Sequence, residues 1–363
     1  MRGVAILLVV LHHIGMRLPL KHSFIANWVP IRYLNPFNYN GYEAVFVFFV
    51  ISGFLITHMS LQRWGSLDKI NLKDFYLRRF ARIMPCLLLL VIALSILHMF
   101  SVKYYTISNP TQSLGGAIFS ALTMHLNWYE GQTGWLPGGW DVLWSLSIEE
   151  VFYLGFPLLC LLVSARKVLV ALLIVLALSL PFTRAVLSNN EIWQEKAYLP
   201  AMSAIATGVL TAMLTQYLES REFRNRNRIV QWLRVFGAFG LIAIFFYEDL
   251  LWRSLKDGSL LILTFSSAGL ILSFHLQQPK PPLPVCGTGW ISTMGRQSYE
   301  IYLMHMFIVF GILEVASIVG TPKAVSFFWY IPTVLLSWLL GAALERWYSR
   351  PCDLYLRNNF LKR

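Results

Sequence analysis

The sequence predicts an all-α, polytopic integral membrane protein, and two observations support this class. Hydrophobic residues make up 56% of the 363 residues and charged residues only 13%, whereas an ordinary soluble domain carries roughly 25% charged residues. The apolar residues also gather in long runs that basic clusters separate. A helix that is apolar on all sides is stable in lipid, because its backbone groups bond to one another.

About ten of these runs are long enough to span a bilayer, which takes roughly 17 to 25 residues. They are centred at 3–19, 42–61, 84–101, 143–164, 168–183, 198–217, 232–248, 258–276, 299–318 and 325–344. We therefore expect a bundle of about ten transmembrane helices. Its membrane domain would comprise residues 1–351, followed by a short basic cytoplasmic tail, 352–363.

Basic residues indicate the orientation, because loops rich in Lys and Arg tend to stay in the cytoplasm. With Arg2 inside, the cytoplasmic segments are 62–83, 165–167, 218–231 and the tail, which carry most of the basic clusters. A further apolar segment, 114–127, is short, and a crossing there would turn the later clusters outward. We therefore expect 114–127 not to span and both termini to be cytoplasmic. The outer loop 102–142 would then hold about 40 residues, and loops of that length are often functional.

The remaining composition limits the class of function. Cys86, Cys160, Cys286 and Cys352 lack metal-ligand spacing and are expected to be unpaired, small apolar residues. The net charge of +12 is explained by topology and by contacts with anionic lipid, so we expect no nucleic-acid partner. The sequence has no glycine-rich phosphate loop and no GxSxG elbow. We expect no metal and no bound cofactor.

The first apolar run combines an arginine with a histidine. Arg2 and His13 are 11 residues apart, so a helix places them on one face with about 16 Å of rise between them. Histidine is the usual general base near neutral pH, and ionisable groups within a bilayer are costly, which favours a function. The alternative is that Arg2 only marks topology and His13 only bonds a helix neighbour.

The sharpest polar pattern within an apolar run is Trp144-Ser145-Leu-Ser147-Ile-Glu149-Glu150-Val-Phe-Tyr153. Ser145 and Glu149 are four residues apart, and Ser147 and Glu150 are three apart, so each pair can face one cavity. Two carboxylates at membrane depth predict a function. One of them could orient His13 or hold a sugar hydroxyl.

Three arginines, Arg78, Arg79 and Arg82, stand at the inner end of the third run. If they converge they form an anion site, because a guanidinium is well shaped for phosphate; plain positive-inside charge is the alternative. Tyr302 and His305 share one helix face, where substrate binding and core packing are both open. For the small residues of Ser52-Gly53, we favour helix packing.

Taken in order, these motifs resemble the membrane acyltransferase-3 family, which modifies bacterial surface glycans, antibiotics and other acceptors. The resemblance runs from Arg2 to about Pro351. It rests on Arg2-x10-His13, Phe48-Phe49-Val-Ile-Ser52-Gly53-Phe54, Tyr76-Leu-Arg78-Arg79-x-x-Arg82-Ile-x-Pro85, Trp144-Ser145-Leu-Ser147-Ile-Glu149-Glu150-x-Phe-Tyr153, Gly295-Arg296-x-Ser298-Tyr299-x-x-Tyr302-Leu-x-His305 and Arg350-Pro351.

The resemblance implies an O-acetyltransferase of the bacterial surface-polysaccharide acetylase type in the cytoplasmic (inner) membrane. Its donor substrate would be a cytoplasmic acyl-CoA, commonly acetyl-CoA. Its acceptor would be a hydroxyl at the outer face, either on a glycan such as that of lipopolysaccharide or on a macrolide-like small molecule. The catalytic residues would be Arg2, His13, Glu149 and Glu150, and the substrate-binding residues Arg78, Arg79, Arg82, Ser145, Ser147, Tyr153, Tyr302 and His305.

In the expected mechanism the arginines bind the phosphates of coenzyme A, and His13 removes the proton from the acceptor hydroxyl. Glu149 or Glu150 holds the imidazolium or the acceptor. Transfer through an acyl-histidine is the alternative to direct attack.

The sequence departs from the family pattern at three places. The family usually carries Leu-Asp-Gly-Leu before the arginine, whereas Met1 directly precedes Arg2 here, so either the start lies upstream or the inner turn is absent. The family often has Asp at the position of Phe46, for which Glu43 could compensate. Some relatives carry a soluble hydrolase-like domain after the membrane part; because this sequence ends at Arg363, we expect none.

Two other classes of protein compete with the enzyme. A proton-coupled transporter would suit buried Glu and His in a polytopic bundle, although the sequence shows no inverted repeat. A non-catalytic membrane scaffold would tolerate Ala at Arg2, His13 and Glu149 without a phenotype.

Overall fold

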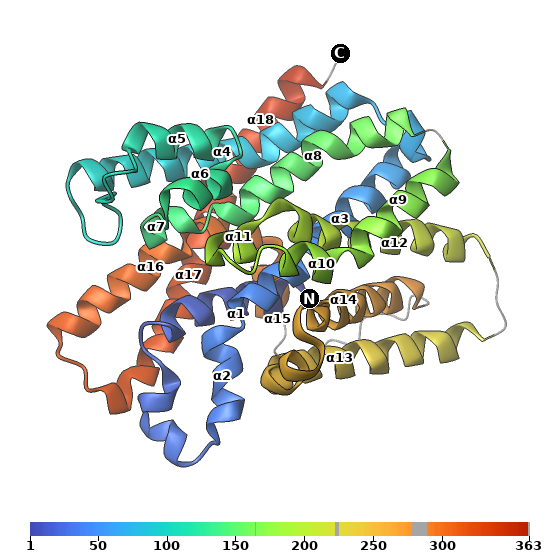
Figure 1. The fold of residues 1–363 in the computed structure, drawn as a ribbon. Coiled ribbons are helices and arrows are strands. Elements are labelled where there is room, and N and C mark those ends of the chain that lie inside the picture. The colour runs from blue at the N-terminus through green and yellow to red at the C-terminus, as the bar shows by residue number, and fades with distance from the viewer. Residues whose placement is uncertain (164, 222–224, 278–288, 362–363) are drawn as a thin grey trace. The chain divides into compact units, whose positions relative to one another are not determined.

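The structure is a computed structural model that describes residues 1–163, 165–221, 225–277 and 289–361. Every regular element in these ranges is helical, which confirms the predicted all-α class (Figure 1). The helices form two compact units. The first contains Met1–Tyr42, Leu72–Val151 and Trp290–Arg363, and the second contains Glu43–Asn71 and Phe152–Gly289.

Seven helical stretches in the described ranges are long and apolar enough to cross a membrane, as in a multi-pass membrane protein. They are Gly41–Trp64, Leu72–Met99, Gly138–Leu162, Glu191–Glu219, Arg226–Leu276, Ser298–Ile318 and Lys323–Phe360. The number is smaller than the ten expected runs for identifiable reasons. The first helix has 14 residues, or about 21 Å, and the run 168–183 is divided between helices of 13 and 6 residues. The stretch Arg226–Leu276 contains two helices that pack against each other.

The first unit contains eleven main helices or parts of helices. They are α1 (Arg2–Gly15), α2 (Ile31–Tyr39), α4 (Leu72–Met99), α5 (Leu114–Leu122), α6 (Leu126–Thr133), α7 (Gly138–Asp141), the first turns of α8 (Trp144–Leu162), α15 (Gly289–Arg296), α16 (Ser298–Ile318), α17 (Tyr330–Leu344) and α18 (Arg350–Phe360). Helix α16 packs against α1, α4 and α17. A Cβ at Gly3 would clash with the carbonyl group of Ile291, so glycine lets α1 approach α15 closely.

Short helical turns complete this unit. They are the 3₁₀ turns η1 (Leu20–His22), η2 (Phe24–Asn27) and η5 (Lys323–Trp329), and the π-helical turn η6 (Glu345–Ser349). An apolar cluster joins Leu20 and Leu34 to Ile312 and Tyr330. This cluster anchors the segment that follows α1 to α16 and α17.

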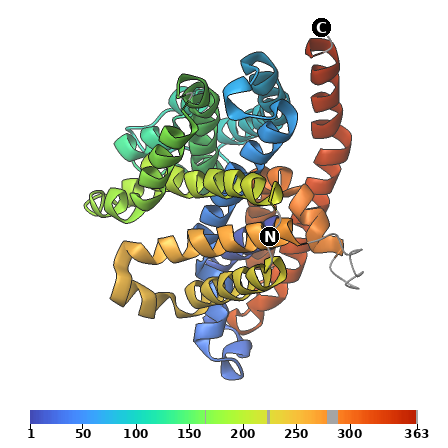
Figure 2. The same cartoon turned by 90° about the vertical axis from the view of Figure 1, so that its right-hand side faces the viewer.

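The second unit contains α3 (Gly41–Trp64) from Glu43 onward and the remainder of α8. It also contains α9 (Arg166–Leu178), α10 (Leu180–Ala185), α11 (Glu191–Lys196), α12 (Tyr198–Glu219), α13 (Arg226–Leu255), α14 (Ser259–Leu276), η3 (Leu67–Lys69) and η4 (Lys256–Gly258). Helices α13 and α14 lie side by side (Figures 1 and 2). A Cβ at Gly53 would clash with the carbonyl of Ile205, and one at Gly208 with that of Val50. This reciprocal approach of α3 and α12 confirms the packing role predicted for Gly53.

The segment 102–142 is folded. Helices α5 and α6 have 9 and 8 residues, too few to cross a bilayer, in agreement with the prediction that 114–127 does not span. Ser113 caps α5 by accepting a hydrogen bond of 3.0 Å from Gly116 N–H. The indole of Trp140 is fully buried and donates to the carbonyl of Tyr105 at 3.2 Å.

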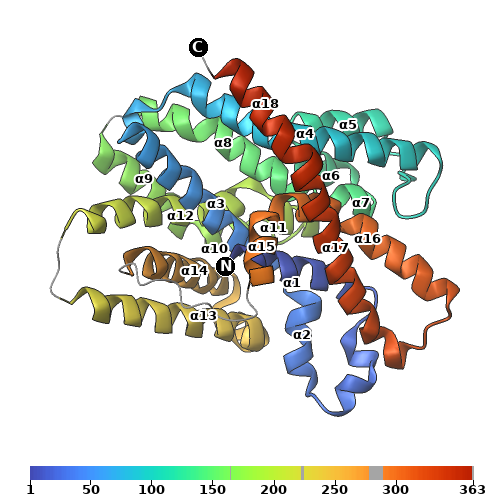
Figure 3. The same ribbon diagram turned by 180° about the vertical axis from the view of Figure 1, so that it is seen from behind.

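Cys86, Cys160 and Cys352 are unpaired, as predicted, and Cys286 lies outside the described residues. Of the residues expected to form a short basic tail, 352–360 belong to helix α18. Helix α18 follows the π-helical turn and packs along α4 (Figure 3).

Candidate functional site

Helix α1 brings His13 against His305 of α16. The ring centroids of these histidines are 5.0 Å apart, and those of His12 and His13 are 5.1 Å apart. His305 has no exposed surface, and His13 is half-buried. We call His12, His13 and His305 the histidine cluster. Helices α1 and α16, which are distant in sequence, thus bring three imidazole rings together in the first unit.

The hydrogen bonds of His305 assign its protons. Its Nδ1 lies 2.7 Å from the carbonyl oxygen of Tyr302, and because a carbonyl can only accept, Nδ1 carries the proton. Nε2 then carries a lone pair. Within the described parts of the chain, neither Nε2 of His305 nor Nδ1 of His13 has a hydrogen-bond partner, and both atoms are buried. Buried polar atoms without partners are rare and often mark functional sites.

Tyr302 connects the histidine cluster to α8. Its hydroxyl donates to the carbonyl of Val142 at 3.0 Å, so the 2.7 Å contact with Ser145 is a bond that the serine hydroxyl donates. Ser145 therefore faces Tyr302. Ser147 faces α6 instead: its hydroxyl accepts from Leu126 N–H at 3.3 Å and lies 3.3 Å from the carbonyl of Leu143. The two serines thus point to different neighbours.

The two glutamates of α8 interact electrostatically with Tyr302 and with an arginine of α4. Glu149 interacts electrostatically with Tyr302 and with Glu150. Glu150 is 6% exposed and interacts with Arg79 and Tyr299. Its Oε1 atom has no hydrogen-bond partner among the residues that the structure describes. A polar path therefore runs from Tyr302 through both carboxylates to Arg79.

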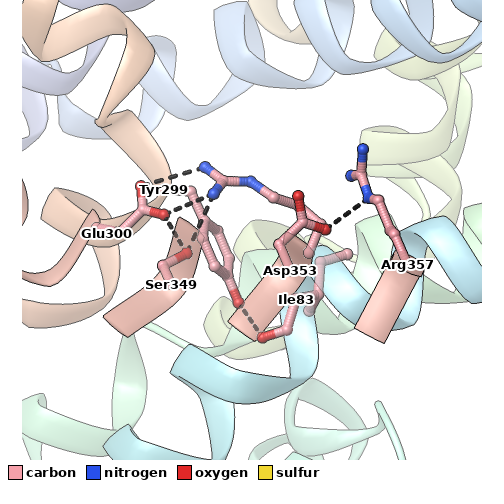
Figure 4. Close-up of polar contacts among 7 residues, drawn as sticks. Ile83, Tyr299, Glu300, Ser349, Asp353 and Arg357 are labelled. Atoms are coloured by element: carbon pink, nitrogen blue, oxygen red, sulfur yellow. Dashed lines mark hydrogen bonds and ion pairs between the residues drawn. The ribbon is translucent and has the colours of Figure 1, made fainter. Parts of the chain in front are cut away.

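Arg82 is held by the fully buried carboxylate of Glu300, which Figure 4 shows beside Ser349. Its Nη1 lies 2.7 Å from Oε1 of Glu300, and its Nη2 donates to Oε2 at 3.2 Å. The hydroxyl of Ser349 donates to the same Oε1 at 2.6 Å and accepts from Nη1 of Arg82 at 3.1 Å. We call these residues the Arg82 triad. The triad joins α4, α16 and η6, so the terminal nitrogens of Arg82 are already engaged.

The other two arginines have different surroundings. Arg78 pairs through Nε with Asp74 at 2.9 Å and is 27% exposed, while Arg79 faces Glu150. The three predicted arginines therefore lie in one region of α4. Arg82 pairs with a carboxylate of α16, whereas Arg78 and Arg79 interact with other carboxylates.

Two predicted residues remain. Arg2 is half-buried where α1 meets α15, with Gly295 beside its Cβ atom. Tyr153 is 6% exposed and belongs to the second compact unit. The other predicted site residues all belong to the first unit.

Sequence reasoning missed two charged residues at this site. Glu300 occupies a position that the family motif leaves open, although an isolated carboxylate in an apolar run is itself a signal. Arg17 follows His13 by four residues and donates to its carbonyl oxygen at 2.7 Å. Its guanidinium also lies 4.9 Å from the ring centre of Phe310. No group of three or more His, Cys, Asp or Glu residues within the described ranges is arranged to hold a metal ion.

Comparisons with known proteins place these residues in a family. A family model described as "Acyltransferase domain" matches residues 1–345. The peptidoglycan O-acetyltransferase OatA of Listeria monocytogenes is 31% identical over 44% of this chain and 25% of its own length. The O-acetyltransferase OatA of Staphylococcus aureus is 23% identical over 97% of this chain and 56% of its own length.

The chain thus spans between a quarter and just over half of these relatives. No solved structure matches it. Because the family model covers nearly all of the sequence and includes the histidine cluster, both α8 glutamates and the arginines of α4, the chain belongs to this acyltransferase family.

Proposed function

We propose that this chain is a membrane O-acetyltransferase that moves an acetyl group from cytoplasmic acetyl-CoA to a hydroxyl of a surface glycan. The observation that carries the proposal is the contact of His13 with His305, in which both rings keep a buried nitrogen without a hydrogen-bond partner in the described structure. A general base needs such a free lone pair near neutral pH. The names of both relatives support the acetyl group, and the name of the Listeria relative, a peptidoglycan O-acetyltransferase, supports a surface polymer as acceptor.

The polar path supports a donor that enters from the arginine end. Arg78 and Arg79 lie in the first turns of α4, and guanidinium groups are well shaped to bind the phosphates of coenzyme A. The path continues through Glu150 and Glu149 to Tyr302, next to His305. We assign the phosphates to Arg78 and Arg79. Arg82 holds α4 against α16 through the Arg82 triad.

In the proposed reaction His13 takes the proton of the acceptor hydroxyl as its oxygen attacks the thioester carbonyl. The C–S bond then breaks, and the imidazolium returns the proton to the coenzyme A thiolate. Base catalysis of this kind contributes roughly 10²- to 10⁴-fold. Glu149, on the histidine side of the path, stabilises the imidazolium. His305 keeps its Nε2 lone pair toward the same region because its Nδ1–H is bonded to Tyr302.

The positive-inside bias supports the accompanying topology. We propose about ten crossings, with both termini in the cytoplasm and the protein in the cytoplasmic membrane. The helices α13 and α14 would account for two crossings, and α1 for one short crossing.

A His13→Ala variant tests the reaction. Membranes containing the wild-type chain are supplied with radiolabelled acetyl-CoA, and the label in isolated surface glycan is measured together with free coenzyme A. We expect His13→Ala to lose at least about a hundredfold in rate, and His22→Ala, a matched exposed histidine, to retain full activity. Wild-type activity in a well-expressed His13→Ala protein contradicts the mechanism. Solute uptake without consumption of acetyl-CoA would instead indicate a transporter.

A further inference from the structure

The C-terminal helix adds a further arginine to the basic region of α4. Helix α18 packs along α4, and Arg357 of α18 interacts electrostatically with both Arg78 and Arg79. All three belong to the first compact unit. Two segments that are almost 280 residues apart in sequence therefore gather three guanidinium groups. Arg357 lies beyond residue 345, where the family match ends.

The arginines of the two helices are held in the same way. Asp353 contacts Nε of Arg357 at 2.7 Å, and Asp74 contacts Nε of Arg78 at 2.9 Å; each aspartate is four residues before its arginine. A contact at Nε leaves the terminal amino groups as donors. In Figure 4 the terminal nitrogens of Arg357 point away from Asp353. The side chains of Arg357 and Arg78 are 34% and 27% exposed, so a ligand can reach them.

Gathering like charges is unfavourable unless anions compensate it. Asp353, Asp74 and Glu150 compensate these charges one by one, while the terminal amino groups of Arg357 and Arg78 stay available as donors. Coenzyme A carries a 3′-phosphate and a pyrophosphate, which are separate groups with several negative charges, and arginine forks bind phosphate oxygens in pairs. We infer that Arg357 is a third donor-binding arginine, which contacts a phosphate group of the acyl-CoA. The inference rests on the proposed function.

The test compares donors that differ in phosphate content. The full-length chain is purified into nanodiscs of neutral phosphatidylcholine, and KM and kcat are measured with acetyl-CoA and with S-acetylpantetheine, which has no phosphate. We expect Arg357→Gln to raise the KM for acetyl-CoA about tenfold, the effect of losing one hydrogen bond to a charged group. Its kcat should change less than twofold, and its KM for S-acetylpantetheine should not change. Arg346→Gln removes an exposed arginine of η6 and should leave both donors unaffected.

Several outcomes would overturn the assignment. An unchanged KM for acetyl-CoA, or an equal rise with the phosphate-free donor, removes Arg357 from the phosphate site. A defect that appears only when anionic phosphatidylglycerol is added to the nanodiscs identifies a lipid headgroup as the ligand. If Arg357→Gln folds poorly, Arg357→Lys keeps the charge and loses the fork, and its KM for acetyl-CoA should still rise.

The two proposals fail separately. If the wild-type chain neither transfers acetyl from acetyl-CoA nor gains thermal stability from added coenzyme A, the proposed donor is wrong. If the wild-type chain does both and Arg357→Gln equals wild type, only the inference about Arg357 is wrong.

Discussion

Removing both charged partners of the Arg82 triad together should destabilise the protein by less than the sum of the two single removals. The carboxylate of Glu300 is completely buried and receives both terminal nitrogens of Arg82, at 2.7 and 3.2 Å, as well as the hydroxyl of Ser349. The guanidinium of Arg82 is 29% exposed. The two charges therefore differ in their access to water, and their deletions should not be equivalent.

The expected magnitudes follow from this asymmetry. Arg82→Ala leaves a buried carboxylate with a single hydroxyl donor, and stranding a buried charge costs about 3–5 kcal/mol. Because water reaches the exposed side of this site, we expect the lower end of that range. Glu300→Ala leaves a guanidinium that keeps contact with solvent and with Ser349, which should cost about 1–3 kcal/mol. Residues in direct contact couple by about 0.5–3 kcal/mol, so the double variant should lose less than the sum.

The assay is thermal denaturation of the detergent-solubilised protein. After heating to each temperature, the fraction of protein that stays monodisperse is measured. The midpoints should fall in the order wild type, Glu300→Ala, Arg82→Ala, with the double variant above the additive value. Ser349→Ala removes one neutral donor and should fall between wild type and Glu300→Ala. Strictly additive losses, or equal midpoints for both single variants, would show that the buried contact does not hold α4 to α16.

Three further changes test other parts of the structure. His305→Ala should lower kcat more than tenfold in the acetyl-transfer assay while KM changes little, because His305 orients the catalytic region rather than the donor; an unchanged kcat would exclude that role. Tyr302→Phe should lower the thermal midpoint more than Ser145→Ala, because Tyr302 forms hydrogen bonds to both Val142 and Ser145, each worth about 1 kcal/mol. Gly208→Ala should reduce the yield of folded protein sharply because the new methyl group clashes with the α3 backbone, whereas Gly155→Ala meets nothing within 4 Å and should match wild type.

The fold class and the placement of Arg2 and His13 on one helix could be predicted because they depend on local patterns. A long apolar run indicates a helix that is stable in lipid, and helical periodicity alone puts Arg2 and His13 on one face. The number of transmembrane spans could not be predicted in the same way. A run of apolar residues does not show that α1 ends at Gly15, or that α13 and α14 form a packed pair.

The contacts that organise the site could not be predicted in this way, because they join residues far apart in sequence. Arg82 and Glu300 are separated by 218 positions, and no local spacing connects them. The three arginines of α4 look equivalent in the sequence, and only the position of Glu300 distinguishes Arg82 from Arg78 and Arg79. Likewise, Arg357, Lys362 and Arg363 suggest a basic tail in the sequence, and the contact of α18 with α4 is visible only in three dimensions.

Helix α16 carries residues from both ends of the candidate site and so connects them physically. Its first turns carry Glu300, which holds Arg82, and then Tyr302 and His305, which face Ser145 and His13. Glu300 and His305 are five residues apart, or about 7.5 Å along a rigid helix. We therefore expect a change that loosens the Arg82 triad to affect the histidine cluster as well. In the proposed reaction the thioester meets a base at a fixed position, so the rigidity of α16 would set how far the acyl group reaches from phosphates bound at α4.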